Sequence, residues 1–180
     1  MAPKEVKIQD KTFVISIPED VLQEKVSKVA ERISNDYDGR DPLFVIMLNG
    51  AFMFATDLLK AVTTPARLTF MKMSSYDGTT STGEVKQVME LTEDIRGRDV
   101  IIVEDIVETG LTMAETVNML QKEGPASIRV CAMFFKPHRL SADISVDYVG
   151  MEIGDAFIVG YGLDYNQYGR NLPCVYELKQ

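Results

Sequence analysis

The chain has 180 residues, 46% of them hydrophobic, and a formal net charge of −8. This length supports one well-filled core rather than two. The acidic balance, with a sequence pI of about 4.7, would repel nucleic-acid backbones and anionic membranes, so we expect neither as a partner. A phosphate-bearing ligand would therefore need backbone amides and a divalent cation for much of its binding.

The two cysteines, Cys131 and Cys174, lie far apart and lack the paired spacing of a zinc site or a redox motif. Cys131 stands in the apolar run VCAMFF, where a free cysteine packs as a small hydrophobe. The N-terminus is charged where a secretory signal would be apolar, and no apolar run approaches the length of a membrane span. These features predict a cytoplasmic protein with reduced cysteines.

The first part of the chain predicts two strands and two helices, followed by a third strand. TFVISI reads as a short strand, and a helix follows with Ser16 as a candidate cap and Pro18 in its first turn. Apolar residues at helical spacing carry that helix to Ile33. LFVIML is typical of a strand covered on both faces. A helix over residues 51–61 and a strand at ARLTFMKM come next.

The second part predicts a return strand at EVKQVMEL, a strand at DVIIVED, a helix over 111–122 and a strand at SIRVCAMFF, with shorter strands near SVDYVG, AFIVGYG and CVYEL. This alternation indicates an α/β fold with a mostly parallel central sheet flanked by helices. We expect a single domain, 1–180, with a small hood built from the N-terminal strand and roughly residues 150–180. The polar stretch SSYDGTTSTGE, roughly 74–84, is expected to be a flexible lid loop.

The segment VIIVEDIVETGLT, residues 100–112, places carboxylates directly after a buried strand. Ligands of open parallel sheets bind beyond the carboxyl ends of the strands, which brings Glu104 and Asp105 to the binding edge. Gly110 allows backbone amides close to a ligand, and the following helix N-terminus favours an anion. Carboxylates suit hydroxyls or a divalent cation, so the pattern favours a phosphorylated sugar. Simple capping and solvated charge remain an alternative on this pattern alone.

The same segment resembles the phosphoribosyl pyrophosphate (PRPP) motif of the type I phosphoribosyltransferases. LNGAFMFATDLL, SSYDG, FFKPHR and FIVGYGLDYNQYGRNLPCVYEL resemble the hypoxanthine-guanine branch of that family, and the likeness extends from about Val21 onward. It implies the type I phosphoribosyltransferase fold and a Mg²⁺-dependent purine-salvage enzyme. Such an enzyme transfers the 5-phosphoribosyl group from PRPP to hypoxanthine, and also guanine, and releases pyrophosphate. The family likeness further suggests a homodimer or homotetramer.

Roles for single residues follow from the resemblance, position by position. Glu108 would handle the proton on purine N7. The ribose hydroxyls and Mg²⁺ would be held by Glu104 and Asp105, and a second Mg²⁺ by Asp164. The 5′-phosphate would lie on Thr109, Gly110, Leu111 and Thr112.

The remaining roles concern the base, the pyrophosphate and the lid. Lys136 would hydrogen-bond the purine 6-oxo group, which distinguishes 6-oxopurines from adenine. The other purine contacts would come from Phe157, Ile158 and Asp164. Pyrophosphate would meet Asn49, Gly50 and Arg170, and the lid would contribute Ser75 and Tyr76.

Three positions depart from the family pattern. Glu108 stands where Asp is usual and is one methylene longer, Leu111 fills a turn position that is often polar or basic, and Asn49 replaces an expected Lys or Arg. The last two reduce the positive charge available to the phosphates. We therefore expect PRPP binding that is weaker or more dependent on Mg²⁺.

Two other interpretations stay open. A regulatory protein on the same fold could use the PRPP pocket as a sensor, although binding RNA would need a basic face that an acidic chain lacks. An enzyme with a preference for xanthine, or less readily adenine, would keep the reaction and change the base. Its choice would depend on carbonyl placement near Ile158 and Asp164.

Overall fold

The computed structural model describes residues 2–75, 85–89 and 91–179. Its elements, in chain order, are β1 (Glu5–Ile8), β2 (Lys11–Ile17), α1 (Glu19–Asp36), β3 (Leu43–Met47), α2 (Phe52–Ala61), β4 (Arg67–Ser75), β5 (Val85–Met89), β6 (Asp99–Val107), α3 (Leu111–Gln121), β7 (Ser127–Phe135), a 3₁₀ turn (Pro137–Arg139), β8 (Tyr148–Glu152), β9 (Ile158–Val159) and β10 (Val175–Leu178).

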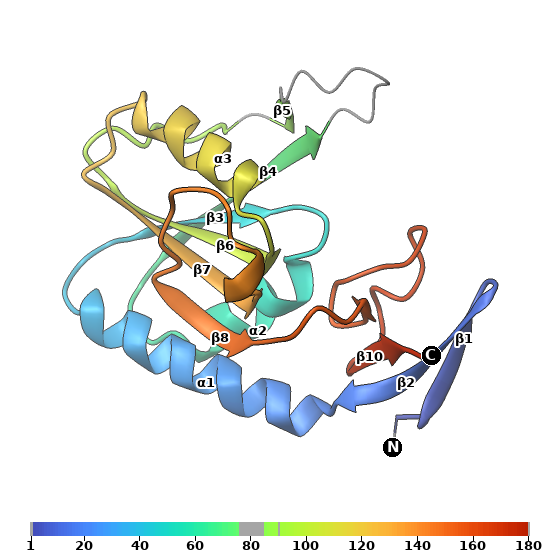
Figure 1. The fold of residues 1–180 in the computed structure, drawn as a ribbon. Coiled ribbons are helices and arrows are strands. Elements are labelled where there is room, and N and C mark those ends of the chain that lie inside the picture. The colour runs from blue at the N-terminus through green and yellow to red at the C-terminus, as the bar shows by residue number, and fades with distance from the viewer. Residues whose placement is uncertain (1, 76–84, 90, 180) are drawn as a thin grey trace.

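These strands form two sheets. The large sheet has the order β5-β4-β3-β6-β7-β8, and all its pairs are parallel except β4 with β5. The small sheet is antiparallel and has the order β1-β2-β10-β9. Figure 1 shows the small sheet beside the large one, near the start of α1. The predicted α/β fold with a mostly parallel sheet is confirmed.

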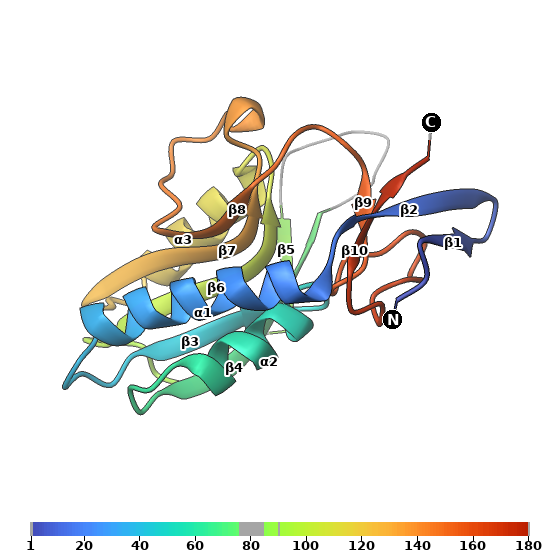
Figure 2. The same cartoon turned by 90° about the horizontal axis from the view of Figure 1, so that it is seen from below.

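Helices cover both faces of the large sheet. Figure 2 shows α1 and α2 running along one face, where their apolar residues pack with Phe44, Ile46 and Ile101. The opposite face, with Val45 and Ile102, packs against α3. All five residues of β3 are consequently buried, which explains why this strand is a continuous apolar run rather than an alternating one. None of the helices in the described part of the chain has the length and apolarity to cross a membrane.

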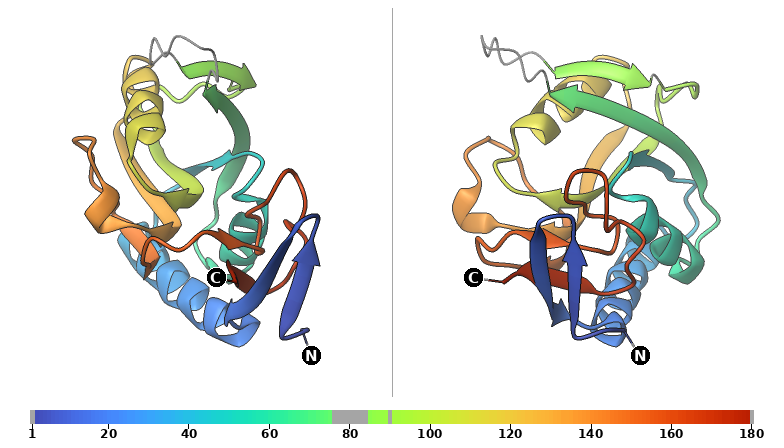
Figure 3. Two further views of the ribbon diagram at one scale, coloured as in Figure 1. Left: turned by 45° about the vertical axis from the view of Figure 1, so that its right-hand side comes forward. Right: turned by 90° about the vertical axis from the view of Figure 1, so that its right-hand side faces the viewer.

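The small sheet joins the two ends of the chain. β2 pairs with β10, and Phe13 of β2 is fully buried in an apolar cluster with Ile8, Val159 and Tyr176. The left view in Figure 3 places this sheet to one side of the large sheet, with the β1–β2 hairpin outermost. β8, by contrast, pairs with β7, so residues 148–152 belong to the large sheet.

The start of the chain differs from the sequence-based expectation in two ways. Ser16 as a helix cap is wrong: Pro18 holds the cap position without a side-chain hydrogen bond, because β2 continues through Ile17. The Ser16 hydroxyl instead donates to Glu177 across the small sheet, at 3.5 Å. Strand β1 was not anticipated, because its four residues, EVKI, alternate between charged and apolar and are too few to give a clear pattern.

A matched pair of phenylalanines tests the core. Phe54 of α2 is fully buried, whereas Phe70 of β4 is 45% exposed. Phe54→Ala should lower the free energy of unfolding by about 3–5 kcal/mol, because it removes transfer energy and leaves a cavity. Phe70→Ala should cost about 1 kcal/mol or less. Urea denaturation measures both, and equal losses would contradict the burial described.

Candidate active site

Several of the predicted site residues lie at the carboxyl edge of the large sheet. From β3 the chain winds through α2 to β4 on one side, and from β6 through α3 to β7 on the other. The direction of winding therefore reverses between β3 and β6, which is where open α/β sheets bind ligands. Asn49 and Gly50 follow β3, and Glu104 and Asp105 lie near the carboxyl end of β6.

Gly50 brings three segments into contact. A Cβ placed on Gly50 would overlap the carboxylate of Asp105, so only glycine lets the loop after β3 approach β6 this closely. A Cβ on Gly162 would in turn overlap the carbonyl oxygen of Gly50. Gly162 has a φ of +100°, which also favours glycine. The loop after β3, the end of β6 and the segment after β9 thus meet at one point.

Glu104 and Asp105 form a crowded, partly buried acidic pair. The Asp105 amide donates to Glu104 Oε1 at 3.1 Å, and the Ile106 amide donates to Asp105 Oδ1 at 2.7 Å. Burial, together with the Asp105 charge, raises the pKa of Glu104 well above its usual value. Burial also raises the pKa of Asp105. Such a pair is stabilised by a cation or by hydroxyl donors.

Lys136 and Glu108 form an ion pair at the ends of neighbouring strands. The Lys136 side chain is only 3% exposed, and its Nζ donates to Glu108 Oε1 at 2.9 Å and to the Ala156 carbonyl at 3.4 Å. The Lys136 amide donates to the Val107 carbonyl at 3.0 Å, which ties the two strand ends together. A buried ammonium needs such a partner. The site therefore offers a strong donor beside a carboxylate acceptor.

The turn into α3 forms a pocket suited to an anion. Gly110 has a φ of +77° at the cap position of α3, and the free amides of a helix N-terminus favour an anion. The Leu111 side chain is 59% exposed. The pocket has a volume of about 210 Å³ and is lined by Glu104, Ile106, Val107, Glu108, Thr109, Gly110, Thr112 and Met113.

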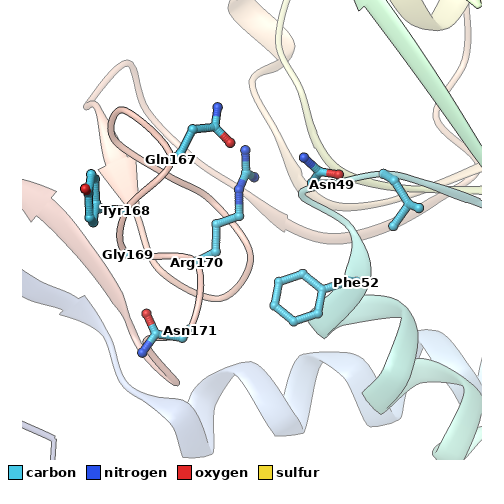
Figure 4. A pocket seen from close by; sticks show the side chains of 8 residues that line it. Asn49, Phe52, Gln167, Tyr168, Gly169, Arg170 and Asn171 are labelled. Carbon is cyan, nitrogen blue, oxygen red and sulfur yellow. The ribbon is translucent and has the colours of Figure 1, made fainter. Parts of the chain in front are cut away.

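A second pocket, of about 540 Å³, lies between the loop after β3 and the segment 167–171. Figure 4 shows the Arg170 side chain extending across it toward Asn49. Arg170 is itself engaged: its Nη2 lies 2.6 Å from Asp164 Oδ1, and its Nη1 donates to the Gly162 carbonyl at 2.8 Å. Two of the three predicted pyrophosphate residues, Asn49 and Arg170, therefore line one cavity, whereas Gly50 does not.

The sequence missed several residues of this second pocket. Phe52, Gln167, Tyr168 and Asn171 all line it. Asn166 and Gln167 have positive φ angles, and the polar, glycine-containing run DYNQYGRN was a usable signal for a tight turn. Lys72 of β4 was also missed. It donates to Asn49 Oδ1 at 3.5 Å and so brings a cation to the position where Asn49 replaces a basic residue.

Phe157 and Ile158 lie on the small-sheet side of the site. Phe157 is 47% exposed, and its ring centroid is 6.3 Å from that of Phe13 and 6.0 Å from that of Tyr165. The residue before it, Ala156, accepts the hydrogen bond from Lys136. This contact brings the Phe157 segment to the Lys136–Glu108 pair.

The predicted metal ligands do not form a closed cage. Within the described residues, no three His, Cys, Asp or Glu side chains gather closely enough to hold a metal ion. Asp164 is ion-paired with Arg170, and its Oδ2 accepts a hydrogen bond from the Gln167 amide at 2.7 Å. Mg²⁺ commonly takes one or two carboxylates and shares the rest with phosphates and water, which this open arrangement fits. Ser75 ends β4, and Tyr76 lies outside the described residues, as does the rest of 76–84.

Comparison with known proteins places the chain in a family. Residues 19–166 match the model of the phosphoribosyl transferase domain, and the protein is a member of that family. It is 39% identical over 175 residues to hypoxanthine-guanine phosphoribosyltransferase of Aquifex aeolicus, covering 96% of this chain and 98% of that one.

Solved structures agree with this assignment. Hypoxanthine phosphoribosyltransferase of Staphylococcus aureus has a TM-score of 0.88 and 40% identity, covering 92% of this chain and 90% of that one.

The chain is also 42% identical over 166 residues to the bifunctional protein TilS/HprT of Listeria monocytogenes. It spans about a quarter of that longer protein, 26% of its length.

The raised pKa of Glu104 makes a prediction about stability and pH. Above the usual pKa of 4.5, the unfolded chain loses this proton while the folded chain retains it. Stability is therefore lost as the pH rises. Glu104→Gln removes that loss. In metal-free buffer, the variant's thermal midpoint should gain on the wild type as the pH rises past that value, and the advantage should shrink at lower pH. A variant whose disadvantage grows with pH would contradict the pKa direction.

Proposed function

We propose that the protein is a hypoxanthine phosphoribosyltransferase of purine salvage, which also accepts guanine. It would move the 5-phosphoribosyl group from PRPP to the base and give IMP or GMP and pyrophosphate. The observation that carries this proposal is the buried Lys136 ammonium 2.9 Å from the Glu108 carboxylate. A 6-oxopurine offers an acceptor, O6, next to N7, which can carry a donor proton, and these match the pair. Adenine would turn an amino donor toward the ammonium.

The same pair suits the chemistry. N9 of the base forms a bond to C1 of the ribose while the bond from C1 to the pyrophosphate oxygen breaks. The base then loses its N7 proton, which passes to Glu108. A positioned carboxylate of this kind contributes on the order of 10²–10⁴-fold. Lys136 holds that carboxylate in place and polarises the 6-oxo group. Phe157 would stack on the ring, and the Ile158 backbone would contact its edge.

PRPP would extend along the carboxyl edge of the sheet. Its 5′-phosphate would lie on the turn formed by Thr109, Gly110, Leu111 and Thr112, and its ribose hydroxyls would donate to Glu104 and Asp105. The pyrophosphate would meet Asn49, Gly50 and Arg170, with Lys72 as an additional cation. The distance of 3.5 Å between Lys72 and Asn49 supports this last assignment.

Magnesium is the cofactor that the carboxylates suit. Bound Mg²⁺ neutralises the charge of the leaving pyrophosphate. Glu104, Asp105 and Asp164 would hold it together with substrate oxygens. The small sheet would be the hood of a single domain, 1–180, and the assembly a homodimer or homotetramer. The full-length relatives named as hypoxanthine-guanine phosphoribosyltransferases support the same substrates.

A purine panel tests the proposed function. Purified protein with PRPP and Mg²⁺ should form nucleotide from hypoxanthine and guanine and little from adenine, as followed by ultraviolet absorbance. Faster nucleotide formation from xanthine than from hypoxanthine and guanine would instead indicate a xanthine-preferring enzyme. No product from any 6-oxopurine, with PRPP binding retained in calorimetry, would contradict the enzyme and favour a sensor.

Glu108 is the residue that the mechanism depends on most directly. Glu108→Gln should lower kcat by about 10²-fold or more, because the amide cannot accept the N7 proton, while the Kd for PRPP with Mg²⁺ stays within about twofold. Glu108→Asp is the control and should retain most of the turnover, since it keeps the carboxylate. A Glu108→Gln protein that turns over at the wild-type rate would show that Glu108 is not the residue that accepts the N7 proton.

A further inference from the structure

The loop from Gly160 to Leu172 carries both charged groups on the pyrophosphate side, Asp164 and Arg170. Its two arms are joined at the base, where the Tyr161 amide donates to the Leu172 carbonyl at 2.8 Å and the Gly162 amide donates to the Arg170 carbonyl at 3.0 Å. The Arg170 guanidinium returns to the Gly162 carbonyl at 2.8 Å. Any shift of these paired residues therefore moves Arg170 and its ion-paired partner Asp164 together.

Tyr161 holds an uncommon backbone conformation where the two arms of the loop are joined. Its φ is +50°, between Gly160 at +95° and Gly162 at +100°. A residue with a Cβ rarely adopts this region unless its surroundings fix it there, and such residues gather at functional sites. The Tyr161 side chain is buried, with 1% exposure, so packing and its hydroxyl group supply the fixing contacts.

The Tyr161 hydroxyl reaches across to the helical layer. It donates to Asp57 Oδ2 on α2 at 2.8 Å, and Gln23 Nε2 on α1 donates to the same oxygen at 2.6 Å. Lys60 Nζ lies 3.5 Å from the other Asp57 oxygen. Burial and the hydrogen bond to Asp57 raise the pKa of the Tyr161 phenol, so it remains a donor throughout the physiological pH range.

Helix α2 connects this contact to the other half of the pyrophosphate pocket. It begins at Phe52, directly after the loop that bears Asn49 and Gly50, and Asp57 lies in its second turn. The Gly50 carbonyl oxygen also touches Gly162, the residue after Tyr161. One helix thus supports both loops that line the second pocket.

We propose that the Tyr161–Asp57 hydrogen bond is a positioning contact for the pyrophosphate half of the PRPP site. It fixes the loop with Asp164 and Arg170 relative to Asn49 and Gly50. Tyr161 touches neither base nor ribose phosphate in this role; it acts through the loop. The inference rests on the proposed function, because it assigns the second pocket to pyrophosphate.

The chain contains a matched control. Tyr148 is also 1% exposed, and its hydroxyl donates to a carboxylate, Asp36, at 2.6 Å. Tyr148 begins β8, and Asp36 ends α1, so this pair lies away from the carboxyl edge of the sheet. Tyr148→Phe and Tyr161→Phe remove the same kind of hydrogen bond, and both should lower the thermal midpoint to a similar extent.

The kinetic constants should separate the two variants. Tyr161→Phe should raise the KM for PRPP, and the KM for pyrophosphate in the reverse reaction, by about fivefold or more. The KM values for hypoxanthine and IMP should change by less than about twofold. Tyr148→Phe should leave all four KM values unchanged. Asp57→Asn keeps an acceptor oxygen for Tyr161 and should fall between the wild type and Tyr161→Phe, which retains a test if Tyr161→Phe folds poorly.

The outcomes are distinguishable. If the wild type turns over hypoxanthine but Tyr161→Phe and Asp57→Asn behave kinetically like Tyr148→Phe, the contact is only structural and the inference is wrong. An equal rise in the KM values for the base and for PRPP contradicts it as well. If the wild type itself forms no nucleotide, the proposed function fails and the inference fails with it.

Discussion

The contact between Gly50 and the Asp105 carboxylate is the constraint on which the rest of the site depends. It brings the loop after β3 against the end of β6, at the place where the winding of the sheet reverses, and it has no room for a side chain. Gly162 closes the same point from the third direction. Three segments far apart in the chain therefore share one small volume, and the carboxylates, the anion pocket and the Arg170 loop are arranged around it.

Charge within the site is largely balanced by its own side chains. Lys136 faces Glu108, and Arg170 faces Asp164. Within the described residues, no cation forms an ion pair with Glu104 or Asp105, and burial raises the pKa of both carboxyl groups. This excess of negative charge in the site has the same sign as the net charge of the whole chain, which is −8. It indicates where added positive charge would be most stabilising.

The sequence anticipated those parts of the molecule whose signal is local. β3 and β6 were recognised because strands covered on both faces are continuous apolar runs, and the turn into α3 was recognised from its acidic residues and Gly110. Tyr161 was not, because its partner Asp57 lies 104 residues away and neither residue carries a distinctive pattern. Lys72 escaped for the same reason: only the pairing of β4 with β3 brings it beside Asn49. Ser16 misled because a local capping signal was overridden by the extension of β2.

The ion pair between Arg170 and Asp164 has a consequence for the thermodynamics of binding. Both groups already have a charged partner at 2.6 Å, so an incoming polyanion exchanges one partner for another instead of adding a new attraction. The electrostatic gain is then a difference between two similar terms. Net affinity in this half of the pocket would depend on how well the geometry of the new partner matches the guanidinium fork, and less on the total charge that it carries.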